Sequence, residues 1–225
     1  MKKSTLSLAL AAALGMAVLS PAHAEGLSFN VGVVSLYKSN GIDQDNRAPK
    51  NFLPALQGGV DYAFSNGFYV GNWNSTGKFG DANVEIDLYA GFSNEFGNGL
   101  SYDVGYAYYV YPDSGGGWNG SEVYGSLTAG IATVKLTRGT SGSIKKHSRL
   151  SLALAQPLTD KLTLDAVVGV RNKSNGNSGA YDYGLGVSYD LGNDLGASAM
   201  LSGAQKSKAG DAGKARLVLG LSKSF

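Results

Sequence analysis

The chain has 225 residues, with no cysteine, 33 glycines, 13 tyrosines, 5 prolines and a formal net charge of +2. A chain without cysteine does not use disulfide bonds for stability, and so small a basic surplus is no footprint of nucleic-acid binding. The mean hydropathy of −0.08 argues against a helical membrane protein, whereas many glycines and tyrosines suit strands that alternate between lipid and water.

Residues 1–24 have the features of a secretory signal peptide. Two lysines form a basic start, an apolar run covers 6–19, and residues 22–24 form a small-x-small cleavage signature. The run is short for a transmembrane helix, so an uncleaved N-terminal anchor is the less favoured alternative. We expect cleavage after residue 24 and a near-neutral mature domain over 25–225, because the two lysines supply the net charge.

Beyond this segment the dominant hydrophobic period is two, which is the period of one face of a β-strand. In 83–94, for example, apolar side chains alternate with Glu85, Asp87 and Tyr89. Each repeat has about the nine to eleven residues that a tilted strand needs to cross a bilayer. The twelve segments that we predict are 27–38, 55–64, 68–76, 83–94, 100–111, 121–129, 131–139, 148–156, 162–171, 180–190, 195–204 and 215–225.

The connections between these segments alternate in length, which supports the count. Turn-like sequences occupy 65–67, 95–99, 157–161 and 192–194, and longer polar stretches occupy 39–54, 77–82, 112–120, 140–147, 172–179 and 205–214. Short turns on the periplasmic rim and longer loops on the other are typical of outer-membrane barrels. The turn at Ala129-Gly130-Ile131 is a weak signal, and a single strand over 121–139 would make the number odd, which single-chain bacterial barrels avoid.

The predicted fold class is therefore all-β: a transmembrane antiparallel up-and-down β-barrel of twelve strands. In lipid every backbone group must be paired within the protein, so a spanning sheet has to close on itself. A soluble β-sandwich shows the same period of two and is the alternative. It would need a second surface to cover the apolar faces that recur in nearly every segment.

The last segment resembles the closing strand of an outer-membrane barrel. It ends in the aromatic Phe225, with Leu217, Leu219 and Leu221 at alternating positions before it. Barrels of this class commonly end in this way, and the barrel-assembly machinery recognises that strand, so we expect Phe225 to be the assembly signal. Lys223 departs from the pattern, and near the interface its side chain can extend to water.

Aromatic residues lie near both predicted rims and indicate two interfacial belts, although tyrosine also favours strands in general. The belt expected beside the short turns comprises Tyr62, Phe64, Phe68, Tyr69, Phe92, Phe96, Tyr102 and Tyr189. The belt expected beside the loops comprises Tyr37, Trp73, Tyr108, Tyr109, Tyr111, Tyr181 and Tyr183.

Several stretches together resemble the TorF-family porins, also called the Gcw_chp family of proteobacterial outer-membrane proteins. They are 54–62, 67–71, 84–91 and 102–112, and the similarity is clearest over 30–125. The resemblance implies an outer-membrane location and a porin role, and it carries no catalytic or substrate-binding residues. Such proteins often have an Arg-Gly-Ile turn after the first strand. Here Lys38 leads into Gly41 and Ile42. If the arginine of the family lines a pore, we expect Lys38 to replace it in part, without its bidentate geometry.

The sequence gives no sign of an enzyme, a cofactor site or a metal site. The mature part contains one histidine, His147, in a predicted loop, and neither a G-x-S-x-G elbow nor paired metal-ligand spacing is present. An exposed loop histidine is far more often solvated than catalytic. The expected partners are therefore outer-membrane lipid, the assembly machinery and small hydrophilic solutes, and not nucleic acid.

The polar strand faces should line the lumen. The residues predicted there are Asp61, Glu85, Asp87, Asp103, Glu122, Lys135, Arg149, Asp165, Arg171, Asp182 and Arg216. Carboxylates dominate the earlier strands and bases the later ones, which would create a transverse field across a narrow pore for small hydrophilic solutes. Two hypotheses stay open: such a diffusion channel, or a non-conducting barrel that acts through its extracellular loops, since the same charges can pair and close the lumen.

Overall fold

The computed structural model describes residues 25–47, 51–172 and 179–225. The expected signal peptide, 1–24, lies outside the described residues, as do 48–50 and 173–178, which belong to two of the expected loops.

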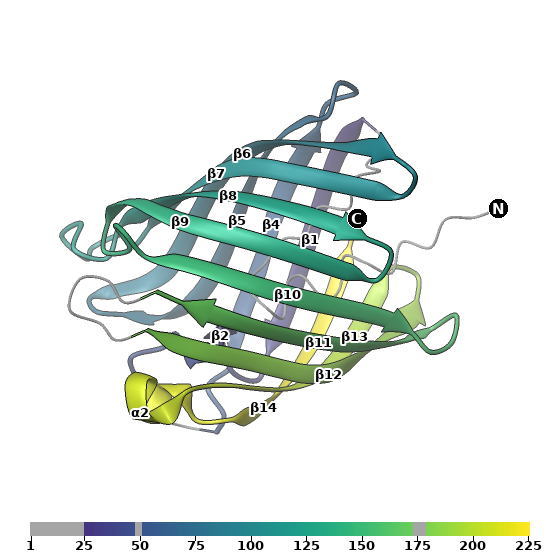
Figure 1. The fold of residues 1–225 in the computed structure, drawn as a ribbon. Helices are drawn as coiled ribbons and strands as arrows, with labels where there is room; N and C mark the ends of the chain where they lie inside the picture. The colour runs from purple at the N-terminus through teal and green to yellow at the C-terminus, as the bar shows by residue number, and fades with distance from the viewer. Residues whose placement is uncertain (1–24, 48–50, 173–178) are drawn as a thin grey trace.

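The described residues form a closed barrel of twelve antiparallel strands in which sequence neighbours pair and the last strand closes on the first (Figure 1). The strands are β1 (Gly26–Val34), β4 (Ala55–Ala63), β5 (Phe68–Phe79), β6 (Ala82–Gly97), β7 (Leu100–Val110), β8 (Gly120–Ala129), β9 (Ala132–Gly142), β10 (Ser148–Pro157), β11 (Leu162–Arg171), β12 (Ala180–Gly192), β13 (Leu195–Ala204) and β14 (Arg216–Ser224). The predicted fold class and strand number are confirmed. The segment 121–139 is two strands, which are joined by a tight turn at Gly130. Gly130 has a φ of 58°, a left-handed conformation that glycine adopts without strain.

Two expected boundaries are wrong. The first strand ends at Val34 rather than at residue 38, because the chain then turns inward and Leu36, Tyr37 and Lys38 are all buried in succession. The expected loop 77–82 belongs mostly to a hairpin, since β5 continues to Phe79 and β6 begins at Ala82. Gly80 at a positive φ allows the tight reversal.

The alternation of side chains divides the barrel into an apolar exterior and a polar interior. On β12, Tyr181, Leu185 and Leu191 are exposed, while Asp182 and Ser188 between them are buried. The same pattern holds on β1, whose exposed residues are Leu27, Phe29, Val31 and Val33. So continuous an apolar exterior exceeds what a water-soluble surface tolerates and matches the lipid-facing band of a membrane barrel.

The two rims differ in the length of their connections. The tight-turn rim carries short hairpins, such as Asn98-Gly99 between β6 and β7 and Asn193-Asp194 between β12 and β13. The loop rim carries the longer connections, including 111–119 and 205–215, and its helix α2 lies at the lower left of Figure 1. The barrel's first and last strands begin and end, respectively, at the tight-turn rim, where Phe29 and Phe225 exchange backbone hydrogen bonds of 3.1 and 2.9 Å.

Residues 35–47, here called the inward segment, leave the end of β1 at the loop rim and enter the barrel. Within it, the short strands β2 (Lys38–Ser39) and β3 (Ile42–Asp43) pair with each other. Leu36 is fully buried and forms an isolated parallel β-bridge with Leu53. The centres of the Tyr37 and Trp73 rings are 5.7 Å apart. The segment therefore narrows the interior near the loop rim.

The described part of the chain contains little helix. It has a four-residue α2 (Lys206–Ala209) followed by the 3-10 turn η1 (Gly210–Gly213) in the connection before β14. None of the helices among the described residues has the length and apolar character needed to span a membrane.

Candidate functional site in the barrel interior

Described residues form a cavity inside the barrel and a further cavity at its tight-turn mouth. The loop-side cavity, of about 330 Å³, is lined by the inward segment and by inward-facing residues of β1, β4 to β11 and β14. The turn-side cavity, of about 530 Å³, lies between the start of β1 and the β4–β5 turn. Asp61 lines both cavities, so they approach each other at this side chain.

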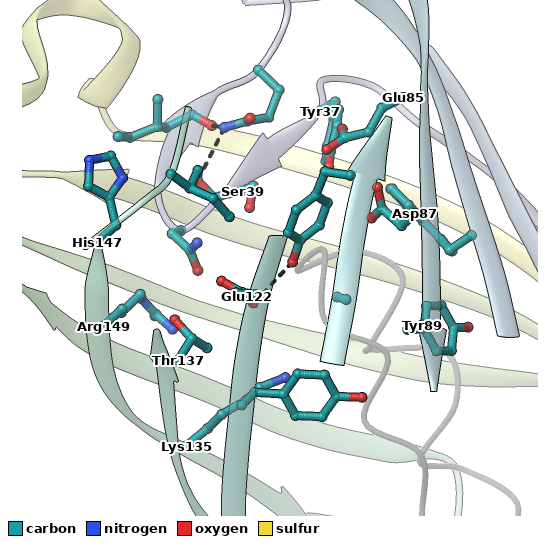
Figure 2. A pocket seen from close by; sticks show the side chains of 18 of the residues that line it. Tyr37, Ser39, Glu85, Asp87, Tyr89, Glu122, Lys135, Thr137, His147 and Arg149 are labelled. Atoms are coloured by element: carbon teal, nitrogen blue, oxygen red, sulfur yellow. Dashed lines mark hydrogen bonds between the residues drawn. The ribbon is translucent and has the colours of Figure 1, made fainter. Parts of the chain in front are cut away.

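One side of the loop-side cavity is acidic and aromatic. Glu85 and Asp87 lie two residues apart on β6, so both side chains point inward. The Tyr111 hydroxyl donates to Glu85 at 2.5 Å, and the Tyr109 hydroxyl donates to Glu122 of β8 at 3.0 Å. Figure 2 shows Glu85 and Asp87 on one side of the cavity and Glu122 nearer its centre.

The other side carries the bases of β9 to β11. Arg149 donates both Nε and Nη2 to the Asp182 carboxylate, at 2.9 and 2.6 Å, and this bidentate pair is buried. Arg171 lies directly opposite Arg149 in the strand register, with its Nε 4.0 Å from Asp182. Lys135 places its ammonium group 4.3 Å from the centre of the Tyr124 ring, a cation–π contact.

A network of tyrosines and carboxylates lies between the two cavities. The Tyr69 hydroxyl donates to Asp103 and shares a further hydrogen bond with Tyr124, both at 2.6 Å. The Tyr89 hydroxyl donates to Asp61 at 2.5 Å. Because these hydroxyls converge where Asp61 lines both cavities, the network forms a polar constriction.

The tyrosines reach across neighbouring strands because the residues beneath them are glycines. Tyr89 is opposite Gly71 in the register, and a Cβ on Gly71 would come within 2.3 Å of the Tyr89 ring. The same holds where Tyr69 covers Gly91 and Tyr124 covers Gly105. Glycine is thus required by the close approach of an aromatic ring rather than by the backbone conformation.

An ion cluster holds the inward segment to the barrel wall. Lys38 donates to one oxygen of Asp43 at 2.6 Å, and Arg216 of β14 donates to the other at 2.5 Å. The Lys38 ammonium group also donates to the carbonyls of Ala212 and Lys214, at 3.1 Å each. Burial lowers the pKa of Lys38, and the Asp43 carboxylate opposes this effect.

The residues predicted to line the lumen occupy different places in the structure. Asp61, Glu85, Asp87, Glu122, Lys135, Arg149 and Arg171 line the loop-side cavity. Asp103 belongs to the constriction, and Asp182 lies behind Arg149. Arg216 is buried against Asp43, and the fully buried Asp165 lines neither cavity. Lys38 does not replace a pore-lining arginine, because its side chain is buried against Asp43.

The prediction of two aromatic belts is partly wrong. Phe64, Phe68, Tyr108 and Tyr181 are exposed on the outside, as a belt requires. Tyr37, Tyr69, Trp73, Tyr109 and Tyr111, by contrast, point into the interior, where the first three are buried. Adjacent aromatics on one strand must face opposite sides, so Tyr108 and Tyr109 could not both have belonged to a belt.

Sequence reasoning did not find the inward segment or the tyrosine network. One local signal was present: the alternation of β1 ends at Ser35, and the apolar Leu36 and Tyr37 then follow each other directly. For the network the signal was the pairing of Tyr with Gly across predicted neighbouring strands. Neither pattern specifies a contact partner without the register of the sheet.

His147 lies at the end of the β9–β10 connection and lines the loop-side cavity. Burial, and to a smaller extent the Arg171 guanidinium, lower the pKa of the His147 imidazole, so it is neutral near pH 7. Among the residues that the structure describes, no group of three or more His, Cys, Asp and Glu side chains is arranged to hold a metal ion.

Comparison with known proteins identifies the family and the fold. A family model described as "Bacterial protein of unknown function (Gcw_chp)" matches residues 19–225, so the chain belongs to the Gcw_chp family. The name TorF has no counterpart in these matches. No curated protein matches the sequence significantly.

Among solved structures the chain is similar in fold to several porins. The KdgM porin matches with a TM-score of 0.63 and 10% identity, over 88% of this chain and 99% of the porin. It has also been solved in complex with disordered oligogalacturonate. The NanC porin matches with a TM-score of 0.54 and 8% identity, over 88% of this chain and 98% of the porin. At such low identities these matches establish the shared barrel fold.

Proposed function

We propose that this member of the Gcw_chp family is an outer-membrane channel through which small hydrophilic solutes diffuse. The observation that carries the proposal is that a polar cavity inside a closed apolar-walled barrel and a cavity at its tight-turn mouth approach each other at Asp61. A polar path of this kind supplies hydrogen-bond partners to a solute along its length, while the barrel wall satisfies its own backbone in lipid.

The apolar outer surface of the barrel favours a location in the outer membrane. A barrel that presents an unbroken apolar band needs lipid as its partner, and bacterial barrels of this kind lie in the outer membrane with short turns in the periplasm. The expected signal peptide over 1–24 would provide export. We therefore place the tight-turn rim in the periplasm and the loop rim at the cell surface.

The charge of the interior favours cations over anions. Asp61, Glu85, Asp87 and Glu122 line the loop-side cavity, and only Lys135, Arg149 and Arg171 oppose them there. Arg149 is already neutralised by Asp182. The resulting excess of negative charge lowers the energy of a cation inside the narrow lumen and raises that of an anion.

Planar-bilayer recording tests this proposal. We expect single-channel steps from the refolded barrel, and a reversal potential in a salt gradient that shows preference for cations. Asp87→Lys and Asp103→Lys should each move the reversal potential toward anions, because both carboxylates lie inside the path. Asp160→Lys, on an exposed turn, is the control and should leave it nearly unchanged. A barrel that gives no steps above baseline would contradict the channel.

A second candidate, a non-conducting barrel that acts through its surface loops, is favoured by one specific observation. Among the described residues, Asp43 with Lys38 and Arg216 forms a buried ion cluster. This cluster holds the inward segment in the barrel, where the segment narrows the interior near the loop rim. Under this candidate the connections 51–54 and 112–120 carry the activity, since 39–47 of the expected loop 39–54 belong to the inward segment. The same recording separates the two, because only the channel conducts.

A further inference from the structure

The loop-side cavity has acceptors on its acidic side that lack partners. Glu85 is 4% exposed, and its Oε2 has no hydrogen-bond partner among the described residues. The same holds, within the described part of the chain, for Asp87 Oδ1. Both lie in a cavity that the rings of Tyr37, Trp73 and Tyr109 also line. Buried carboxylate oxygens beside aromatic faces provide the attraction that an ammonium group needs.

The opposite side of the same cavity has donors that lack partners. Nε and Nη2 of Arg171 are buried without a hydrogen-bond partner among the described residues, and the nearest carboxylate, Asp182, is held by Arg149. The Lys135 ammonium group faces the same space and is held by the Tyr124 ring. A guanidinium edge with two open donors matches the two oxygens of a carboxylate.

We infer that the loop-side cavity is a binding site for amino-acid-type zwitterions, meaning amino acids and short peptides. The ammonium group would bind at Glu85 and Asp87, and the carboxylate would bind at Arg171. A cavity of about 330 Å³ is at the lower end of the range for small-molecule sites. A solute with one charge would leave the buried groups of the other side without partners, whereas a zwitterion satisfies both sides.

This inference rests on the proposed function, since it names the solute class of the channel. It can nevertheless be tested without conductance, because Trp73 lines the cavity and reports on its contents. The chain has 2 tryptophans, and Trp118 is on the exposed connection between β7 and β8. In a Trp118→Phe background, the fluorescence of the refolded barrel in detergent micelles therefore comes from Trp73 alone.

Three probes of matched structure distinguish the contribution of the ligand's ammonium group from that of its carboxylate. Diglycine carries both groups, N-acetylglycine is diglycine without its ammonium group, and glycine N-methylamide is diglycine without its carboxylate. We expect a saturable change in Trp73 fluorescence with diglycine at an affinity roughly tenfold or more above that of either single-charge probe. Equal binding of glycine N-methylamide would overturn the inference in favour of a simple cation site. The absence of any saturable response would overturn it altogether.

Substitutions test which residues bind each end of the ligand. Arg171→Gln should weaken diglycine binding roughly tenfold and leave glycine N-methylamide unchanged, and Glu85→Gln with Asp87→Asn should weaken diglycine but not N-acetylglycine. Exposed Arg138→Gln and Glu95→Gln are the matched controls and should bind diglycine as the parent does. Loss of binding in the controls would overturn the assignment. Single-channel steps without diglycine binding would refute this inference alone, and binding without steps would refute the channel alone.

Discussion

At the scale of single residues, Asp43 connects the inward segment to β14. Its two oxygens accept from Lys38 of the inward segment and from Arg216 of β14, and all three side chains are buried. A buried ion cluster contributes little net stability as a whole. The removal of one member is nevertheless costly, because the remaining charges lose their compensation in a low-dielectric interior.

We therefore predict that Asp43→Asn releases the inward segment. Lys38 and Arg216 would then face each other as uncompensated cations, at a cost of about 3 kcal/mol. Trypsin should begin to cleave after Lys38, which is buried in the parent, while cleavage after the exposed Arg47 should stay as it was. Peptide mass mapping of the digested barrel measures both sites.

The control for this prediction is Asp113→Asn, an exposed carboxylate in another connection at the loop rim. Protection of Lys38 in the Asp43→Asn protein would show that the segment is held by its packing at Leu36 and Tyr37 rather than by the ions.

At the scale of strands, the pairing of tyrosine with glycine shapes the interior between the cavities. Gly71 and Gly91 on β5 and β6 lie under Tyr89 and Tyr69, so each ring can lie across its neighbour strand. The hydroxyls then reach Asp61 and Asp103. The register of two hairpins thereby decides which carboxylates belong to the constriction.

Gly71→Ala should destabilise the barrel by about 1–3 kcal/mol, as overpacking does in other cores. The added Cβ would lie 2.3 Å from the Tyr89 ring and 2.4 Å from an oxygen of Asp61, so the constriction must shift. Gly125→Ala on β8 is the matched control, because its Cβ would meet its nearest neighbour at 3.8 Å. Urea unfolding in micelles compares the two proteins. Equal midpoints would show that the Tyr89 ring moves aside freely.

At the scale of the whole molecule, the barrel exists only when β14 pairs with β1. Phe225 forms backbone hydrogen bonds with Phe29, but its side chain is 70% exposed and its ring contact is with Lys223, at 5.4 Å. Lys223 also donates to the carbonyl of Asn193 in the adjacent turn, which accounts for a lysine near the end of this strand. The ring therefore adds little to the packing of the closed barrel.

If Phe225 is the assembly signal, its ring should matter for assembly in the cell and not for folding in vitro. We predict that Phe225→Ala strongly lowers the amount of heat-modifiable barrel in the outer-membrane fraction, yet refolds into micelles as the parent does. Phe225→Tyr retains an aromatic ring and is the control for cellular assembly. Equal outer-membrane amounts of the Ala variant and the parent would exclude the signal role.

The sequence by itself determined the class of fold, the twelve strands and the side chains that face inward, such as Glu85, Asp87 and Arg149. These properties are local, since the period of two and the turn residues express them within each segment. Boundaries were less accurate where the chain leaves the sheet, as at Val34, because a local pattern does not show where a strand loses its neighbour.

Only the tertiary structure decided which charged side chains are paired with each other and which keep atoms without a partner among the described residues. Asp43 and Arg216 are 173 residues apart, and Arg149 meets Asp182 only through the pairing of β10, β11 and β12. Sequence spacing says nothing of such partners, because closure of the barrel and the inward turn at Ser35 bring them together. Of the predicted basic wall, Arg149 is therefore neutralised by Asp182 and Arg216 is buried against Asp43. In the loop-side cavity, Glu85, Asp87 and Arg171 retain atoms without partners among the described residues.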